Sequence, residues 1–395
     1  MITFELALEK ILKNTFPLPA EKVRIERSVG RTLREDIYCS FDMPPFNKSA
    51  VDGYAVRAVD LKNSQATLRR AGLVQAGDVF KGKVSAGQCV KIMTGAPLPA
   101  GADSVVMVEN TSERDGLVKF SKAAGKGDHV CRRGEDIKKG SKILGRGTVI
   151  SVSHIAVLAA AGRSFIKTGS LPEVSVINTG GEIVPPCARL GGSRIYNSNG
   201  PMLEALLKRD NIAAVPVIVK DNAEKLKTAF AKALKSDIVL ISGGVSMGDY
   251  DLVPAVLKSL GVREIFHKVK MKPGKPLFFG RKGKTIVFGI PGNPVSNFLA
   301  YLAFVRPAIL KMSGRGIFAP EFKTGVCAGI FAPNTPRKAF VLSKAGEKHA
   351  QYSLTEVSNN GSADILALAG ANGFAVVKEG AFLAKNEKAK FITWQ

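Results

Sequence analysis

The chain has 395 residues, 45% of them hydrophobic, and a formal net charge of +24 at pH 7. This length and composition exclude a fibrous or low-complexity protein and predict roughly two to four packed units. The positive charge favours anionic partners, but Lys and Arg are spread along the whole chain beside one Trp and six Tyr. A nucleic-acid binder clusters its charge and adds stacking aromatics, so nucleic acid is not an expected partner.

The cysteines and the apolar segments favour a cytoplasmic protein. Five cysteines lie far apart with no C-x-x-C pair, which argues against a disulfide framework and a structural zinc site. The N-terminal segment has acids where a signal peptide carries positive charge, and it predicts an amphipathic helix instead. The most apolar later stretch, residues 298–310, is interrupted by Arg306 and Pro307, so we expect it to be too short and broken to span a bilayer. No membrane anchor is expected.

The first part of the chain predicts a helix followed by a turn-rich β region. Residues 3–14 have apolar positions at helical spacing, and Thr3 can cap the first turn. Residues 23–38 predict a short strand and a further helix or strand. Residues 40–135 alternate Gly-rich turns with short Val and Ile runs, which is typical of a small β-rich domain. An Ala-rich helix is expected over residues 153–162.

From Pro172 onward strands and helices alternate, with glycine-rich turns after the strands. That alternation predicts a mostly parallel sheet, in which ligands bind at the carboxyl ends of the strands. The expected strands are residues 174–177, 213–219, 237–241 and 285–290, and the expected helices are residues 199–209, 223–234, 252–260 and 295–312. Beyond Pro320 short β segments return and predict a small closing barrel or sandwich.

These patterns together predict an α/β multi-domain protein, with one mostly parallel α/β sheet domain and further β-rich domains. The expected parts are a discontinuous linker domain of helix and β structure, an inserted β-rich domain, an α/β domain and a C-terminal β-barrel-like domain. Their expected bounds are, in the same order, residues 1–39 with 136–170, residues 40–135, residues 171–315 and residues 316–395.

A glycine-rich turn, Ser242-Gly-Gly-Val-Ser-Met-Gly-Asp, directly follows one predicted strand. Consecutive glycines let backbone N–H groups converge on an anion, and a following helix adds a favourable dipole. Ser242, Gly243, Gly244 and Ser246 are therefore candidate substrate-binding residues. The alternative is a tight strand-to-helix turn without a ligand. This region has neither G-x-G-x-x-G nor G-x-x-x-x-G-K-[ST], which argues against dinucleotide or P-loop chemistry.

Three carboxylates, Glu182, Asp221 and Asp251, each fall just beyond a predicted strand. Because the carboxyl ends of parallel strands share one edge of a sheet, we expect these side chains to lie along one rim. Carboxylate oxygens beside phosphates usually hold Mg²⁺ rather than zinc. The alternative is that Asp221 and Asp251 cap the helices that follow them.

A basic segment, His267-Lys-Val-Lys-Met-Lys-Pro-Gly-Lys-Pro, follows the glycine-rich turn. If this segment is a strand, the side chains of Lys268, Lys270 and Lys272 lie on the same face of it. The turn at Pro273-Gly274 then directs Lys275 away from that face. Like charges on one face repel each other unless anions neutralise them, so an anion pocket is favoured over an idle surface.

Two polar residues stand out in the β-rich region. Asp52 precedes Gly53 and by default belongs to a turn, and Thr94-Gly-Ala-Pro is an ordinary loop sequence. Residue types and spacing therefore lead to a multi-domain protein with a phosphate or oxyanion site, and they do not select its reaction.

These segments, taken in order, resemble the molybdopterin molybdenumtransferase family, which includes MoeA and the C-terminal module of gephyrin. The matching segments span nearly the whole chain and are Pro45-Phe-Asn-Lys-Ser-Ala-Val-Asp-Gly-Tyr-Ala, Met93-Thr-Gly-Ala-Pro-Leu-Pro, Arg132-Arg-Gly-Glu-Asp-Ile, Asn178-Thr-Gly-Gly-Glu-Ile, Ser242-Gly-Gly-Val-Ser-Met-Gly, Lys272-Pro-Gly-Lys-Pro, Pro291-Gly-Asn-Pro-Val-Ser and Gly361-Ser-Ala-Asp-Ile-Leu. The resemblance places the family's functional positions on Asp52, Thr94, Glu135, Glu182, Asp221, Asp251, Lys268, Lys272 and Ser362.

The resemblance implies an elongated four-domain subunit in a homodimer, with one subunit's α/β domain facing the other's β-rich domain across the active site. It implies adenylyl-molybdopterin and molybdate as substrates, molybdenum cofactor and AMP as products, and Mg²⁺ as cofactor. A molybdopterin adenylyltransferase is an implied partner. The expected catalytic residues are Asp52, Asp221, Asp251 and Glu182, the last three also holding Mg²⁺. The expected substrate-binding residues are Thr94, Ser242, Gly243, Gly244, Ser246, Lys268, Lys272, Lys275 and Ser362.

The hypothesis for Asp52 is that it comes from the partner subunit and positions metal or water. Two positions depart from the family pattern. Gly181 stands where relatives commonly have Asp or Asn, and Phe340-Val-Leu-Ser lacks an arginine that relatives carry. That anion contact is either missing or supplied by Arg337. Two other functions are weighed: a non-catalytic molybdopterin-binding carrier or scaffold, and a homologue that inserts tungstate.

Overall fold

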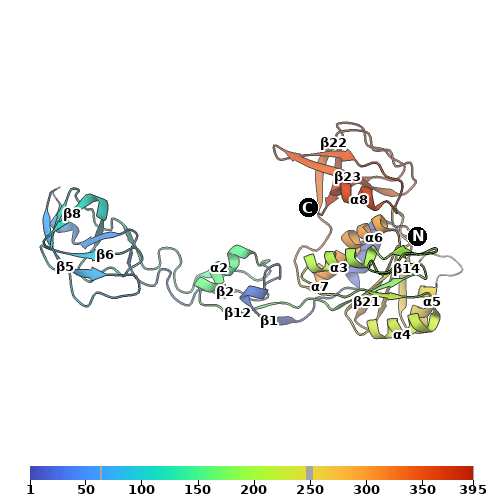
Figure 1. Ribbon diagram of the computed structural model, residues 1–395, viewed down its shortest axis with the longest axis horizontal. Helices are drawn as coiled ribbons and strands as arrows, with labels where there is room; N and C mark the ends of the chain where they lie inside the picture. The colour runs from blue at the N-terminus through green and yellow to red at the C-terminus, as the bar shows by residue number, and fades with distance from the viewer. Residues whose placement is uncertain (63–64, 246–251, 395) are drawn as a thin grey trace. The chain divides into compact units, whose positions relative to one another are not determined.

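The computed structural model describes residues 1–62, 65–245 and 252–394. The chain divides into two compact units, and each is described by itself (Figure 1). The first unit combines Met1–Arg34, Gly147–Val152 and Phe165–Gln395, and the second combines Glu35–Arg146 and Ser153–Ser164. Both units are thus assembled from segments that are distant in the sequence. The finer division into four domains stays a prediction.

The first unit contains a six-stranded sheet in the order β16-β13-β17-β21-β20-β18. The four strands from β16 to β21 run parallel, as the alternation of strands and helices predicted. The other two pair antiparallel, because a tight turn with Gly283 at φ +57° joins β20 directly to β21. The strands are β13 (Val174–Thr179), β16 (Val217–Val219), β17 (Ile238–Ser242), β18 (Arg263–His267), β20 (Phe278–Lys282) and β21 (Thr285–Ile290).

Helices cover both faces of this sheet. Along β17, Leu240 packs into one hydrophobic core, whereas Val239 and Ile241 pack into another on the opposite face. Strands buried on both faces are apolar along their whole length, which explains the uninterrupted Val and Ile runs in the sequence. The helices that follow the parallel strands are α3 (Asn199–Arg209), α4 (Ala223–Ala233) and α5 (Leu252–Ser259).

The long helix predicted over residues 295–312 is present, but the prediction that its apolar stretch is too short and broken to span a bilayer is wrong by length. Residues 294–312 form α6 (Pro294–Ala300), the π-helical turn η4 (Tyr301–Val305) and α7 (Arg306–Met312) without interruption. Pro307 lies in the first turn of α7, next to the π-helical turn, where a missing N–H is tolerated. The 19-residue helix is long enough to cross a bilayer, but 89% of its most apolar window is buried inside the protein. It is the central core helix of the first unit.

The N-terminal helix α1 (Phe4–Lys13) forms as predicted, and the Thr3 hydroxyl accepts the N–H of Leu6 at 3.2 Å. Its buried residues Phe4, Ala7 and Ile11 join the core that surrounds α6 and α7. The following strand β1 (Ala20–Arg24) pairs antiparallel with β12 (Phe165–Gly169) and precedes a single 3-10 turn, η1 (Ile25–Arg27).

The C-terminal strands close into a barrel rather than a sandwich, because β23 pairs with both β24 and β25. The short strand β19 (Met271–Lys272) from the α/β region adds to β23 at Ala339. This pairing carries the basic segment to the barrel edge. The remaining elements are β22 (Phe322–Cys327), β23 (Lys338–Lys348), β24 (Gln351–Glu356), α8 (Ile365–Gly370), β25 (Gly373–Val377) and β26 (Lys388–Thr393).

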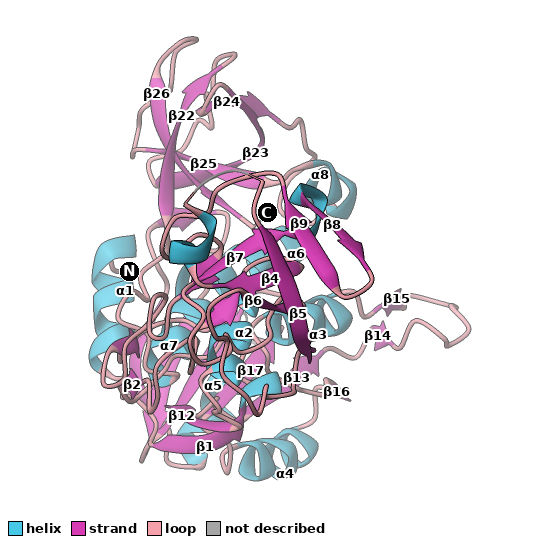
Figure 2. Ribbon diagram, turned by 90° about the vertical axis from the view of Figure 1, so that its left-hand side faces the viewer, coloured by secondary structure: helices cyan, strands magenta, loops and turns pink. Residues whose placement is uncertain are grey.

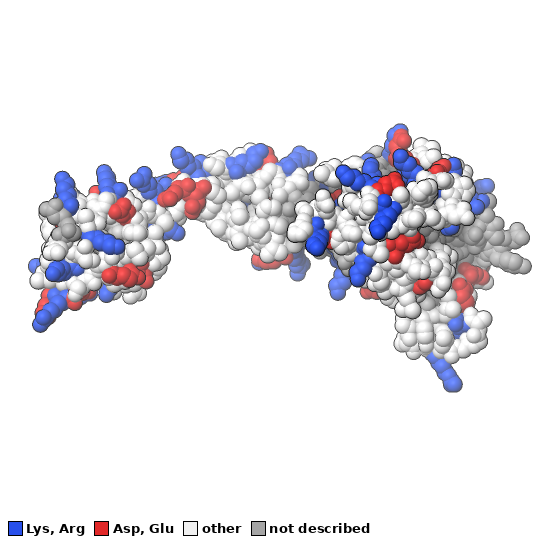
Figure 3. All heavy atoms as spheres, turned by 90° about the horizontal axis from the view of Figure 1, so that it is seen from above, with Lys and Arg blue, Asp and Glu red and all other residues white. Residues whose placement is uncertain are grey.

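Between β13 and α3, the chain of the first unit forms a short parallel pair of strands, β14 (Ile183–Val184) and β15 (Ile195–Tyr196). Figure 2 shows the loop between these strands projecting away from the sheet. Basic side chains are scattered over the face of the molecule drawn in Figure 3, with acidic ones among them, as the sequence suggested.

The second unit is β-rich, and its six-stranded sheet has the order β7-β4-β6-β5-β9-β8. Its described hydrophobic residues include two small clusters, one of them around Tyr54 and Phe120. The sheet strands are β4 (Gly53–Val56), β5 (Thr67–Val74), β6 (Gln88–Ile92), β7 (Ser104–Met107), β8 (Thr111–Arg114) and β9 (Leu117–Phe120). The other elements are β2 (Ile37–Tyr38), β3 (Lys48–Ser49), η2 (Ala58–Leu61), η3 (Val108–Asn110), β10 (Val130–Cys131), β11 (Lys142–Leu144) and α2 (Val152–Ala160).

Candidate functional site

The first unit has a cavity of about 870 Å³ at the carboxyl ends of its parallel strands. Ligands of open α/β sheets bind at this edge. The segments that follow β13, β16, β17 and β21 all contribute to its wall. We call it the glycine-turn cavity, and its lining includes Thr179, Gly180, Glu182, Asp221, Ser242, Gly243, Gly244, Val245, Gly292 and Asn293.

The turn after β17 requires glycine. Gly243 and Gly244 have φ angles of +94° and +63°, which side chains rarely tolerate. A Cβ on Gly243 would lie 2.5 Å from the carbonyl oxygen of Thr179, and one on Gly244 would lie 2.7 Å from Val253. A bare turn of this kind can present backbone N–H groups to an anion. The predicted residue Ser246 lies outside the described residues.

Two asparagines that the sequence analysis did not single out fix Ser242 beneath this turn. The side-chain amides of Asn199 and Asn297 both donate to the Ser242 hydroxyl, at 3.1 and 2.9 Å. The same amides donate to the carbonyl oxygens of Gly292 (2.6 Å) and Pro291 (3.0 Å). The asparagines therefore bind the glycine turn to the turn after β21. Polar residues at the start of two predicted helices were the only signal in the sequence.

Two predicted carboxylates line the glycine-turn cavity. Asp221 follows β16, and its Oδ2 accepts the backbone N–H of Gly181 at 3.2 Å. The cap of α4 is Asn222, whose side chain accepts the N–H of Lys225, so the alternative that Asp221 caps this helix is wrong. Glu182 is exposed at the same cavity.

The glycine-turn cavity supplies two of the three carboxylates that were predicted to bind Mg²⁺. Glu182 and Asp221 offer carboxylate oxygens of the kind Mg²⁺ binds, and the third predicted ligand, Asp251, lies outside the described residues. Within residues 1–62, 65–245 and 252–394, no group of three or more His, Cys, Asp or Glu side chains is close enough together to hold a metal. A cation here would complete its shell with substrate phosphates or water.

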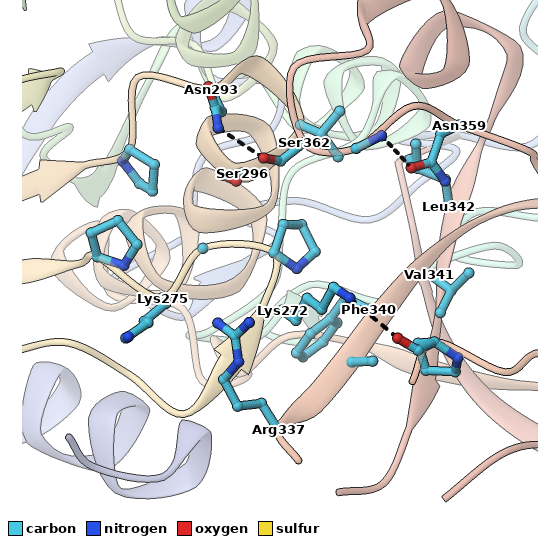
Figure 4. Close-up of a pocket in the computed structure, with 18 of the residues that line it drawn as sticks. Lys272, Lys275, Asn293, Ser296, Arg337, Phe340, Val341, Leu342, Asn359 and Ser362 are labelled. Atoms are coloured by element: carbon cyan, nitrogen blue, oxygen red, sulfur yellow. Dashed lines mark hydrogen bonds between the residues drawn. The ribbon is translucent and has the colours of Figure 1, made fainter. Parts of the chain in front are cut away.

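A second cavity of about 580 Å³ lies between the 272–276 segment, the start of α6 and the barrel strands β23 and β24 (Figure 4). We call it the lysine cavity, because Lys272 and Lys275 line it together with Arg337. Arg337 donates to the carbonyl oxygen of Met271 at 3.0 Å, and the Lys272 ammonium donates to that of Pro333 at 3.2 Å. Three cations thus face one space that suits an oxyanion.

The predicted strand with three alternating lysines is wrong. β18 ends at His267, Lys268 has φ +91°, and the N–H of Val269 bonds to the carbonyl oxygen of Lys275 at 3.0 Å. This return of the chain brings Lys275 to the cavity, whereas the sequence predicted that the turn directs it away. Lys268 lines neither cavity, and Lys270 pairs with Glu379 at 2.6 Å.

The opposite side of the lysine cavity carries uncharged and acidic groups. Ser362, a predicted substrate residue, accepts a hydrogen bond from Asn293 at 2.8 Å (Figure 4). Glu356 lies at the end of β24, and burial of part of its side chain raises the pKa of its carboxyl. Pro276, Pro291 and Asn293 line both cavities, which are therefore adjacent.

In the second unit, the structure brings Asp52 and Thr94 together. Asp52 Oδ1 accepts the backbone N–H of Thr94 at 2.7 Å and its hydroxyl at 2.8 Å. The backbone hydrogen bond, followed by the hydroxyl, lowers the pKa of the Asp52 carboxyl, which holds it ionised. Glu135 instead closes its own turn by accepting the N–H of Arg132 at 2.6 Å.

Three family models match successive segments of the chain. They describe the MoeA N-terminal region, domains I and II, over residues 2–162, a probable molybdopterin binding domain over 175–311, and the MoeA C-terminal region, domain IV, over 324–394. A molybdopterin molybdenumtransferase of Staphylococcus aureus strain Mu50 is 33% identical over 380 residues, which covers 95% of this chain and 91% of that protein. The chain belongs to the MoeA family of molybdopterin molybdenumtransferases.

Other members of the MoeA family agree with this assignment in sequence and in fold. A molybdopterin molybdenumtransferase of Staphylococcus epidermidis strain RP62A is 32% identical over 385 residues, covering 96% of this chain and 92% of its own. The crystal structure of the molybdopterin biosynthesis protein MoeA from Pyrococcus horikoshii superposes with a TM-score of 0.83 at 30% identity, covering 100% and 99% of the two chains. The predicted family and the predicted multi-domain fold, with a mostly parallel sheet and β-rich parts, are confirmed.

Proposed function

We propose that this MoeA-family chain inserts molybdate into adenylyl-molybdopterin and releases molybdenum cofactor and AMP. The observation that carries the proposal is the pair of adjacent cavities. One has a glycine turn, which suits a phosphorylated ligand, and two carboxylates, which suit Mg²⁺ bound beside that ligand. The other has three cations, which suit an oxyanion. Their shared wall places the two reactants next to each other, so that an encounter between them becomes an oriented one.

The glycine-turn cavity is assigned to the adenylylated substrate. The backbone N–H of Gly244 binds a phosphate, whereas that of Gly243 is bonded to the carbonyl oxygen of Ile290 at 3.2 Å and ties the turn to β21. Ser242 holds the turn in place through its two asparagines. Mg²⁺ bound by Glu182, Asp221 and Asp251 would neutralise negative charge on the phosphates. Without that neutralisation, the two carboxylates at this cavity would repel the substrate.

The lysine cavity is assigned to molybdate. Lys272, Lys275 and Arg337 supply three positive charges for a dianion, and Ser362 supplies a hydroxyl. Arg337 thereby takes the place of the arginine that Phe340-Val-Leu-Ser lacks. Lys268, which the resemblance also implied, is left out of this assignment because it lines neither cavity.

Asp52 and Thr94 are assigned to the active site of a homodimer, with Asp52 contributed by the partner subunit to position metal or water. Ionisation of Asp52, favoured by its two hydrogen bonds from Thr94, suits that role. We further propose that a molybdopterin adenylyltransferase supplies the substrate and that the reaction takes place in the cytoplasm. The five cysteines lie far apart in the sequence with no C-x-x-C pair, which suits a reducing compartment.

A turnover assay tests this function. Purified protein is incubated with adenylyl-molybdopterin and Mg²⁺, and AMP release is followed before and after molybdate is added. We expect release to depend on molybdate and to fall at least about tenfold in Lys272→Ala, since a charge-assisted contact to the oxyanion is lost. The matched control, Lys388→Ala on the exposed face of β26, should behave as wild type.

Two outcomes distinguish the alternatives. Binding of adenylyl-molybdopterin without AMP release would favour a carrier or scaffold. A parallel assay with tungstate replaces molybdate by an oxyanion of the same shape and charge, and a faster rate with tungstate would identify the chain as a tungstate-inserting homologue.

A further inference from the structure

Asn293 occupies the N-cap position of α6 but does not cap the helix. Asparagine at this position normally accepts a backbone N–H from the first turn through its side-chain oxygen. Here the Asn293 side-chain amide points to the barrel segment and donates to the Ser362 hydroxyl at 2.8 Å (Figure 4). The Asn293 side chain therefore makes no hydrogen bond to the backbone of the first turn of α6.

Ser362 performs that capping function in its place. The N–H of Val295, in the first turn of α6, bonds to the carbonyl oxygen of Ser362 at 3.0 Å. Two hydrogen bonds running in the same direction thus hold Ser362 against the helix start. One satisfies a helix N–H that would otherwise be left without a partner, and the other engages the hydroxyl oxygen.

The bond from Asn293 decides what the hydroxyl of Ser362 can offer to the lysine cavity. A serine hydroxyl has one hydrogen to donate and accepts through its oxygen. Because the Asn293 amide donates to one of the two lone pairs on this oxygen, its N–H cannot take the hydroxyl hydrogen, which remains for a group in the cavity. Ser362 lines this cavity together with Lys272, Lys275 and Arg337, so an anion held by the three cations can accept this hydrogen.

We propose that Asn293 is a positioning residue that holds the Ser362 hydroxyl as a hydrogen-bond donor toward an oxyanion in the lysine cavity. This inference rests on the proposed function of that cavity. Asn293 acts through Ser362 and carries no charge itself. Its contribution should therefore vanish when the serine hydroxyl is removed.

The test is a double-mutant cycle on molybdate binding, measured by equilibrium dialysis with the purified full chain. Ser362→Ala should weaken binding about tenfold, because a hydrogen bond to a charged ligand is lost. Asn293→Ala should weaken it by a smaller factor. Asn293→Asp should weaken it most, since a carboxylate takes the hydroxyl hydrogen and turns the serine lone pairs toward the anion.

The second half of the cycle repeats both Asn293 substitutions in the Ser362→Ala background. Asn293→Ala should then have no further effect, and Asn293→Asp should retain only the effect of its added charge. If Asn293→Ala weakens binding equally in both backgrounds, or not at all while Ser362→Ala weakens it, the positioning function is wrong. Should Asn293→Ala fail to fold, Asn293→Leu, which removes the donor and keeps a similar side-chain volume, takes its place in the cycle.

Two controls separate this function from simple helix stabilisation and from failure of the site. Asn222→Ala removes a true asparagine cap from α4, so it should lower the melting temperature and leave molybdate affinity unchanged. Lys272→Ala reports on the cavity itself. If molybdate binds Lys272→Ala as tightly as wild type, the proposed oxyanion site fails, whereas loss of binding there with unaffected Asn293 variants overturns only the function of Asn293.

Discussion

Gly243 shows how a single residue can fix the shape of a ligand site. Its φ of +94° and the 2.5 Å that would separate a Cβ from the Thr179 carbonyl oxygen both exclude a side chain. We predict that Gly243→Ala lowers the free energy of unfolding by about 1–3 kcal/mol through backbone strain, and also abolishes molybdate-dependent AMP release. Urea unfolding and the turnover assay measure the two effects.

The matched substitution is Gly191→Ala, in the loop between β14 and β15. An added Cβ there meets no atom within 4 Å, so its effect on stability should stay within about 0.5 kcal/mol. Equal losses in the two variants would mean that the glycine turn has no special requirement for glycine.

Glu356 is the one carboxyl among the described residues that line the lysine cavity, and it opposes an anion there. Burial raises the pKa of Glu356, so its charge is lost at a higher pH than that of an ordinary glutamate. Molybdate affinity should therefore rise as the pH falls through this raised pKa. Above it, Glu356→Gln should bind molybdate about fivefold more tightly than wild type, as removal of one nearby like charge implies.

Equilibrium dialysis across a pH series compares the two proteins. The Glu356→Gln curve should be flatter and should meet that of the wild type at the acidic end, where Glu356 is protonated. Parallel curves would show that the carboxyl does not influence the bound anion.

Among the secondary-structure elements, those with long local patterns were predicted best. The apolar runs of β13, β17 and β21 identified the parallel strands, and the helical spacing after Thr3 identified α1. Shorter elements depend on contacts that the local sequence does not contain. The segment from Lys268 to Lys272 has the alternation of a strand but folds back on itself, because β19 pairs with the distant strand β23.

The difference between local patterns and long-range contacts also explains which residues of the candidate site could be predicted. Strand ends could be recognised, and with them Asp221, Glu182 and the glycine turn. The asparagines around Ser242 and the arrival of Lys275 and Arg337 in one cavity depend on how α3, α6 and the barrel pack, which no local pattern encodes. Arg306 and Pro307 likewise suggested that the apolar stretch of residues 298–310 is too short to span a bilayer, whereas the helix continues through both residues within the packed core.

Helix α1 provides a test of packing at the element scale. Phe4 is 3% exposed. The centroid of its ring lies 5.0 Å from that of Phe304 and 5.1 Å from that of Phe340. Phe340 also lines the lysine cavity. Phe4→Ala should lower the free energy of unfolding by about 3–5 kcal/mol, because it leaves a cavity between the core helix and β23. Leu6, also in α1, is 39% exposed, so Leu6→Ala should lower the free energy of unfolding by less than about 1 kcal/mol. Comparable losses would show that α1 is not anchored through Phe4.

For the whole molecule, the functional residues divide between the two units. Asp52 and Thr94 belong to the second unit, whereas Lys272, Ser362 and both cavities belong to the first. The proposed homodimer makes a specific claim about this division. Each active site combines the first unit of one subunit with the second unit of the other, so that two chains with different defects can repair each other.

Mixing two inactive variants tests that claim. Asp52→Asn and Lys272→Ala should each be inactive alone, because each removes one side of every site. After subunit exchange, half of the dimers in an equal mixture carry both variants, and one of the two sites in each such dimer has both native residues. Molybdate-dependent AMP release should therefore recover to about a quarter of the wild-type rate. If exchange is verified with differently tagged subunits and no activity returns, Asp52 and Lys272 of the same chain must act together, and the site is built within one subunit.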